Sequence, residues 1–180
     1  MGLVLDILIL FALVGGILWC MRRALARTLL GIFTLFLSTL FSALLYGPII
    51  SWFATIAGSA NSGRSAGSFV FGGLLIVFDI ILEFTIHRNY PDLRIRALKT
   101  WDHILGAIVG VVWAAFAVSL AIVILNFASL TFGGDAPIIP QLVTTSKLVP
   151  VFREFFKLPL LGIRPLFPQG LPEILATFVR

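Results

Sequence analysis

The sequence predicts an all-α integral membrane protein, in which four transmembrane helices are followed by a C-terminal interfacial amphipathic tail. Of its 180 residues, 59% are hydrophobic and only 12% are charged, whereas about 25% of the residues of a soluble domain are charged. The hydrophobic residues form long uninterrupted runs and do not alternate with polar ones, which excludes a transmembrane β-barrel. The bilayer must therefore be crossed by helices, which satisfy their own backbone hydrogen bonds.

Four apolar runs have the length of about 20 residues that a bilayer requires. They cover residues 3–21, 28–46, 69–86 and 103–127, and we assign residues 1–127 to a four-helix bundle. Gly47 and Pro48 should end or kink the second helix, because proline lacks the helical N–H donor. The apolar stretch 49–56 leaves open whether the chain dips into the bilayer there. The small residues of segment 58–68 predict a flexible loop outside the membrane.

The positive charges predict the orientation of the chain in the membrane. The segments after the first and third spans carry Arg22, Arg23, Arg27, Arg88, Arg94, Arg96 and Lys99, against Arg64 in the opposite loop. Because cytoplasmic loops are enriched in Arg and Lys, residues 22–27 and 87–102 should be cytoplasmic and both termini should face outward. The net charge of +5 then reflects topology and contacts with the lipid bilayer, and we expect no nucleic-acid partner.

Residues 128–180 are predicted to form a proline-rich tail at the membrane surface. Its prolines divide the tail into pieces too short to cross a bilayer: Pro137, Pro140, Pro150, Pro159, Pro165, Pro168 and Pro172. Within residues 147–157, apolar side chains recur at helical spacing and most charged ones fall on the other side, a pattern typical of a helix that lies in the membrane plane. Glu173, directly after a proline, predicts a further short helix.

No catalytic constellation emerges from the sequence. His87 and His103 flank a predicted loop, no carboxylate pair adjoins a nucleophile, and Cys20 is the only cysteine. A glycine-rich phosphate-binding loop with a lysine is also missing. We therefore predict a protein that is not an enzyme and that has no catalytic, cofactor-binding or metal-binding residues.

Asp79 and Glu83 form a possible intramembrane polar pair. They are four residues apart and therefore share one face of the third span. A charged residue inside a membrane usually faces protein or water and often carries function, so a proton or ion relay is one interpretation. The favoured interpretation is structural: Glu83 reaches the interface and Asp79 pairs with a basic loop residue such as Arg94 or Arg96.

Small residues predict a helix-packing stripe on the fourth span. Gly106, Gly110 and Ala114 recur every four residues, which lets a neighbouring helix approach closely. The stripe can serve packing within the bundle or between copies of the chain, and the sequence leaves both open. We accordingly expect self-association or contact with other membrane subunits.

Several short segments resemble those of a known family. Asp6 lies early in the first span, Met21-Arg22-Arg23-Ala24-Leu25-Ala26-Arg27 follows that span, and Trp101-Asp102-His103-Ile104-Leu105-Gly106-Ala107-Ile108-Val109-Gly110 opens the fourth. Their order and spacing resemble the colicin V production protein family, the CvpA-like membrane proteins of bacteria. The tail segment Leu148-Val149-Pro150-Val151-Phe152-Arg153-Glu154-Phe155 is similar as well. The chain departs from the family where Arg23-Ala24 and Trp113-Ala114 stand in place of Arg-Gly.

The resemblance implies a non-catalytic inner-membrane protein with an accessory or scaffolding role in colicin V production or secretion, or in envelope homeostasis. It implies no catalytic residues. Two other functions remain open. The chain could be an accessory transmembrane subunit of a larger respiratory or photosynthetic complex, or a small transporter or channel that uses Asp79 and Glu83 as its polar path.

Overall fold

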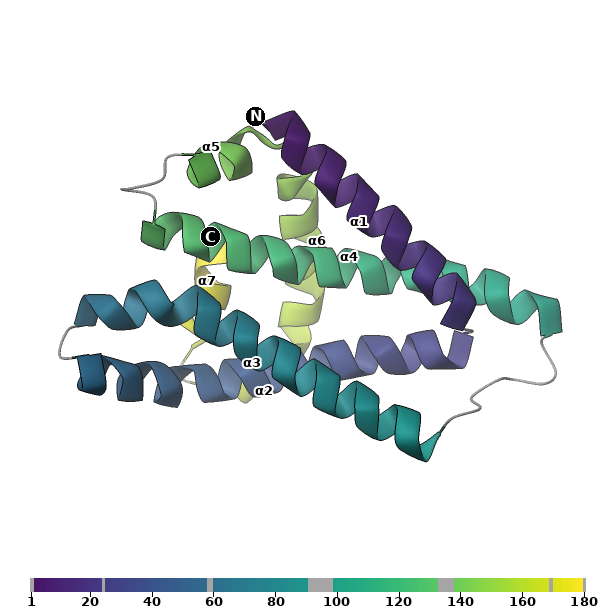
Figure 1. Ribbon diagram of the computed structural model, residues 1–180, viewed down its shortest axis with the longest axis horizontal. Helices are drawn as coiled ribbons and strands as arrows, with labels where there is room; N and C mark the ends of the chain where they lie inside the picture. The colour runs from purple at the N-terminus through teal and green to yellow at the C-terminus, as the bar shows by residue number, and fades with distance from the viewer. Residues whose placement is uncertain are drawn as a thin grey trace.

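The computed structural model describes residues 2–23, 25–57, 60–90, 99–132, 138–168 and 170–179, and within these ranges every regular element is helical (Figure 1). The four long helices are α1 (Gly2–Arg23), α2 (Leu25–Ala57), α3 (Ala60–Asn89) and α4 (Lys99–Phe132). In the part of the chain that is described, these four are long and apolar enough to cross a membrane. The predicted class, an all-α membrane protein with four spans, is confirmed.

The long helices form two antiparallel pairs (Figure 1). α2 packs along α3, α1 packs along α4, and contacts of α4 with α2 and α3 join the pairs. The ends that carry the basic residues of α1 and α2 lie at one end of the bundle, and the two chain termini lie toward the other. Side chains from the helices and the tail share one core, with Phe71, Leu120, Val123 and Phe156 at most 2% exposed.

The sequence predicted that Gly47 and Pro48 would end or kink the second helix, and the helix does not end there. α2 continues to Ala57 with Pro48 inside it and is 33 residues long, or about 50 Å at 1.5 Å per residue. A proline removes a single helical donor, and neighbouring helices and hydroxyl side chains compensate for this in membrane proteins. Here α3 packs along α2 and supports it over this stretch.

The prediction of a loop over residues 58–68 is wrong for residues 60–68, because α3 already begins at Ala60. Residues 58 and 59 lie outside the described ranges. One of the small residues, Gly67, allows close packing: a Cβ added there would lie 2.7 Å from both the Tyr46 hydroxyl and Phe127 Cε1. The helices α2 to α4 contain 33, 30 and 34 residues, so each is longer than the roughly 30 Å thickness of a hydrocarbon core. Each of these helices therefore extends beyond the part that crosses the lipid.

The tail folds into α5 (Ile138–Thr145), α6 (Val149–Ile163), the 3₁₀ turn η1 (Arg164–Leu166) and α7 (Glu173–Val179). α6 runs across the long helices (Figure 1) and buries one face, which consists of Val149, Phe152, Phe156, Leu160 and Ile163. The predicted amphipathic helix is thus confirmed and extends further than residue 157. The short helix after Pro172 is also confirmed, whereas α5 was not predicted.

Candidate functional site: a charged cluster between α1, α2 and α3

Charged side chains of three helices meet at the basic end of the bundle. Arg23, at the end of α1, forms an ion pair with Glu83 of α3, and the two side chains are 22% and 37% exposed. One helical turn further along α3, His87 Nδ1 lies 2.5 Å from Nη2 of Arg27, which belongs to the first turn of α2. The cluster therefore joins α3 to the turn between α1 and α2.

The partner of His87 sets the direction of its hydrogen bond. An arginine guanidinium has only donors, so in this contact Arg27 donates and His87 Nδ1 accepts. His87 thus provides an acceptor for one arginine of the cluster, and the carboxylate of Glu83 pairs with the other, Arg23.

Arg23 makes a second contact within α1. Its guanidinium carbon lies 4.8 Å from the centroid of the Trp19 ring, a cation–π arrangement that is favourable when the cation is partly desolvated. Arg23 is thereby held from two sides, by an aromatic face one turn back and by the carboxylate of Glu83. Both contacts restrict the long side chain to one position between α1 and α3.

The cavity inside this cluster is too small for a substrate. Its volume is about 10 Å³, and it is lined by Arg23, Arg27, Leu30, Gly31, Thr34, Glu83 and Ile86. A single water needs roughly 10–15 Å³ of such volume. The geometry therefore suits a structural junction of charged groups, with space for no more than about one water.

Asp79 lies one turn from Glu83, further from the basic end. It is half-buried, on the helical stripe that continues from the buried Phe71 and Leu75. Among the residues that the structure describes, no hydrogen bond or ion pair reaches Asp79. The partners expected for Asp79, namely Arg94 and Arg96, lie outside the described residues. Glu83, which was expected to reach the interface, pairs with Arg23 of α1.

The first turn of α4 contacts the end of α1 and the start of α2. Asp102, only 4% exposed, accepts a hydrogen bond at 3.0 Å from the backbone N–H of Leu25, the first residue of α2. His103 Nδ1 donates to the Met21 carbonyl at 3.0 Å. One residue of α4 thus caps the N-terminus of α2, and its neighbour satisfies a carbonyl near the C-terminus of α1.

Asp6 plays a corresponding role at the opposite end. Its carboxylate accepts hydrogen bonds from Ser146 Oγ at 2.5 Å and from the backbone N–H groups of Leu148 and Lys147 at 3.2 and 3.3 Å. Ser146 Oγ also accepts from the Val149 N–H at 3.2 Å, at the start of α6. A carboxylate at this position also interacts favourably with the positive, N-terminal end of the α6 helix dipole. Asp6 therefore ties α1 to the tail.

The predicted packing stripe lies against α1. A Cβ added at Gly110 would lie 2.5 Å from Cys20 Cβ, and one added at Gly16 would lie 2.9 Å from Ala114 Cβ. Gly106 is buried as well. Beside this contact lies an apolar groove of about 470 Å³ between α1 and α4, lined by Ala12, Gly15, Gly16, Trp19, Trp113, Ala114, Ala117, Val118 and Ala121.

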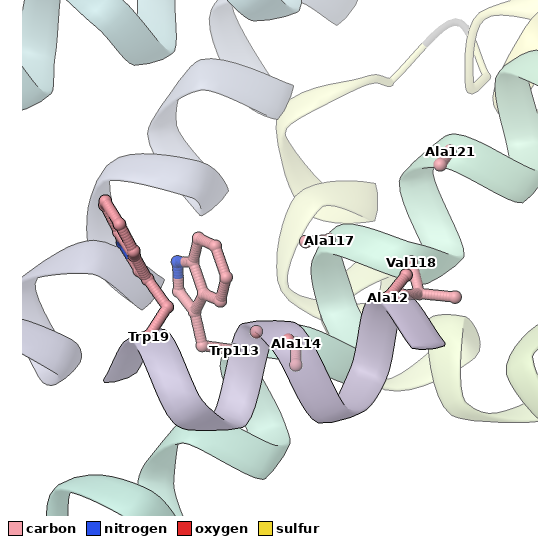
Figure 2. Close-up of a pocket in the computed structure, with 9 residues that line it drawn as sticks. Ala12, Trp19, Trp113, Ala114, Ala117, Val118 and Ala121 are labelled. Atoms are coloured by element: carbon pink, nitrogen blue, oxygen red, sulfur yellow. The ribbon is translucent and has the colours of Figure 1, made fainter. Parts of the chain in front are cut away.

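Figure 2 shows the Trp19 and Trp113 indoles at the same end of this groove. The indole nitrogen of Trp113 lies 3.3 Å from the position of a Cβ at Gly31, so a glycine in α2 makes room for this ring. Trp113 fills the space between α1, α2 and α4 with an apolar side chain. The groove offers packing and no titratable group.

The described residues contain no group of three or more His, Cys, Asp or Glu side chains that could hold a metal ion. The polar contacts instead recur in the segments whose order and spacing resemble those of a known family. Asp6, the basic run after α1 and the Asp102-His103 pair each hold a turn or a helix end. Those roles were not predicted from the sequence, although Asp6 and Asp102 were visible as charged residues at the ends of apolar spans.

Comparison with known proteins decides the family. The sequence matches the family described as Colicin V production protein over residues 5–157, a range that covers α1 from its fourth residue, the whole of α2 to α5 and the first turns of α6. The chain belongs to the colicin V production protein family. Neither curated proteins nor solved structures provide a match. The family is not known for enzymatic activity, and together with the four apolar helices it makes the chain a multi-pass membrane protein.

Proposed function

We propose that this colicin V production family protein acts without catalysis in the bacterial inner membrane, as an accessory or scaffolding factor in toxin production or secretion, or in envelope maintenance. The observation that carries the proposal is the Arg23–Glu83 junction. Its charges pair with each other across α1 and α3, around a cavity of about 10 Å³ that has no room for a substrate or a transported solute.

The other polar contacts support the same interpretation. Asp102 caps α2, and Asp6 holds the start of α6. These carboxylates accept hydrogen bonds from backbone N–H groups and one hydroxyl, so they stabilise helix ends. The charged side chains in these contacts fix the protein's own helices, and a rigid helical frame is suited to present a surface to other components.

The functional test is complementation in a toxin-producing strain whose own copy has been deleted. We expect the deletion to reduce toxin export and resistance to a membrane-active detergent. Arg23→Glu and Glu83→Arg alone should restore little, since each places like charges together. The double charge swap should restore most of the wild-type level, because a structural ion pair tolerates reversal.

Two outcomes would contradict this proposal. Normal export and detergent resistance in the deletion strain would remove the biological role. A double charge swap that is present at wild-type abundance in the membrane but inactive would show that a carboxylate is needed at position 83 itself, as a proton relay or transporter requires.

The orientation is part of the proposal, with the basic turn and the start of α4 in the cytoplasm and both termini outside. Thr144 and Trp101 are both exposed and lie in α5 and in the first turn of α4. In a Cys20→Ala background, an impermeant maleimide should label Thr144→Cys in cells with a permeabilised outer membrane, and Trp101→Cys only after lysis. Labelling of both from one side would overturn the orientation.

A further inference from the structure

Two recesses lie on opposite flanks of α6 and differ in chemistry. The first, here the cationic recess, has a volume of about 560 Å³ and is lined by Lys157, Leu160, Leu161, Arg164, Phe167, Pro168, Gly170, Leu171 and Ala176. The second, here the apolar groove under α6, measures about 360 Å³ and is lined by Leu29, Ile32, Phe33, Phe36, Val112, Phe116, Phe155, Leu158 and Pro159. Two cations and no acid line the first, and every residue that lines the second is apolar.

The cationic recess lies closer to the chain termini, and the apolar groove under α6 lies closer to the basic end of the bundle. α7, which borders the cationic recess, lies on the side of α6 nearer the chain termini, whereas the start of α2 extends toward the basic end (Figure 1). α6 carries Arg153, Glu154 and Lys157, charges that are costly inside hydrocarbon, so α6 lies at the membrane interface. The apolar groove under α6 then opens toward the acyl chains and the cationic recess toward the headgroup layer.

An exposed apolar ridge connects the two recesses. Leu161, which lines the cationic recess, is 63% exposed, and Leu158, which lines the apolar groove, is 65% exposed. They are three residues apart and therefore adjacent on the outer face of α6. Exposed leucines between a cationic site and an apolar groove match a ligand with an anionic head and a hydrocarbon chain.

We propose that the tail binds one anionic phospholipid, with its phosphate between Lys157 and Arg164 and an acyl chain over Leu161 and Leu158 into the apolar groove under α6. Arg164 is exposed, and its planar guanidinium matches two phosphate oxygens. Lys157 Nζ donates to Glu154 Oε1 at 2.6 Å, and an ammonium has two further donors. The volume of the cationic recess falls in the range of small-molecule sites.

The test measures lipid binding to the full-length protein by native mass spectrometry, after delipidation in mild detergent. The probes are dioleoyl phosphatidylglycerol and, with matched chains, zwitterionic dioleoyl phosphatidylcholine. The wild type should retain one phosphatidylglycerol in preference to phosphatidylcholine. Lys157→Gln/Arg164→Gln should weaken phosphatidylglycerol binding by roughly tenfold or more, since each cation near an anionic headgroup contributes to affinity.

The control variant is Lys147→Gln, which removes an exposed cation outside the cationic recess and should leave binding unchanged. Lys157→Arg/Arg164→Lys keeps both charges and should retain binding. Equal binding of the two lipids by the wild type would overturn the proposal, even if the double variant misfolds. Displacement of phosphatidylglycerol by millimolar inorganic phosphate would also overturn it, since the site would then recognise a free anion.

Discussion

Replacing Gly110 with leucine should separate α1 from α4 and lower the free energy of unfolding by about 1–3 kcal/mol or more, the range seen for overpacked cores. Even a Cβ at this position would lie 2.5 Å from Cys20 Cβ and 3.8 Å from the Ile17 Cα. The backbone of α1 cannot yield without losing its contact with α4. The measurement is unfolding of the detergent-solubilised protein by a titration with sodium dodecyl sulfate.

Gly15 provides the matched control for this prediction. It belongs to α1, yet nothing lies within 4 Å of a Cβ added there, so Gly15→Leu should change stability by less than about 0.5 kcal/mol. A second variant tests the contact itself: Cys20→Gly should restore most of the stability lost in Gly110→Ala, because it removes the atom that clashes. Equal destabilisation by Gly15→Leu and Gly110→Leu would contradict this account of the α1–α4 contact.

Replacing Asp6 with alanine should release the start of α6 from α1. The substitution removes the acceptor for Ser146 Oγ and for the N–H groups of Lys147 and Leu148, and it leaves the Ser146 hydroxyl that bonds the Val149 N–H without its anchor. Hydrogen exchange followed by mass spectrometry should show residues 146–152 exchanging at least roughly tenfold faster. The first turn of α4, far from this contact, should keep its wild-type rate.

Asp6→Asn separates the charge from the geometry of this contact. Asparagine keeps one acceptor oxygen, so exchange in residues 146–152 should lie between that of the wild type and that of Asp6→Ala. Unchanged exchange in Asp6→Ala would show that the tail is held by its buried face alone. That face includes Phe152, Phe156 and Leu160, each at most 7% exposed.

The candidate site was predictable only in part. The spacing of Asp79 and Glu83 identified one polar stripe on α3, because residues four apart share a helical face. Their neighbours could not be predicted, since Glu83 meets Arg23 across 60 positions of sequence and Asp102 caps Leu25 across 77. In the same way, the small residues at positions 106, 110 and 114 predicted close packing but not that Cys20 and Gly16 of α1 would be the partners.

The sequence by itself determined the class of the protein and its number of spans. Hydrocarbon leaves no alternative partner for backbone N–H and C=O groups, so four apolar runs of sufficient length must become four helices whatever their packing. The amphipathic spacing of residues 147–157 likewise determined a helix in the tail, because α6 has one apolar face.

Only the tertiary structure decided where the helices end and how the polar groups are used. Pro48 and the small residues 60–68 read locally as helix breakers, yet both lie in helices because α2 and α3 support each other along their length. Asp6 became the anchor of the tail through a hydroxyl 140 positions away. Such contacts depend on which helices pack side by side, and a local pattern of residue types contains no information about that choice.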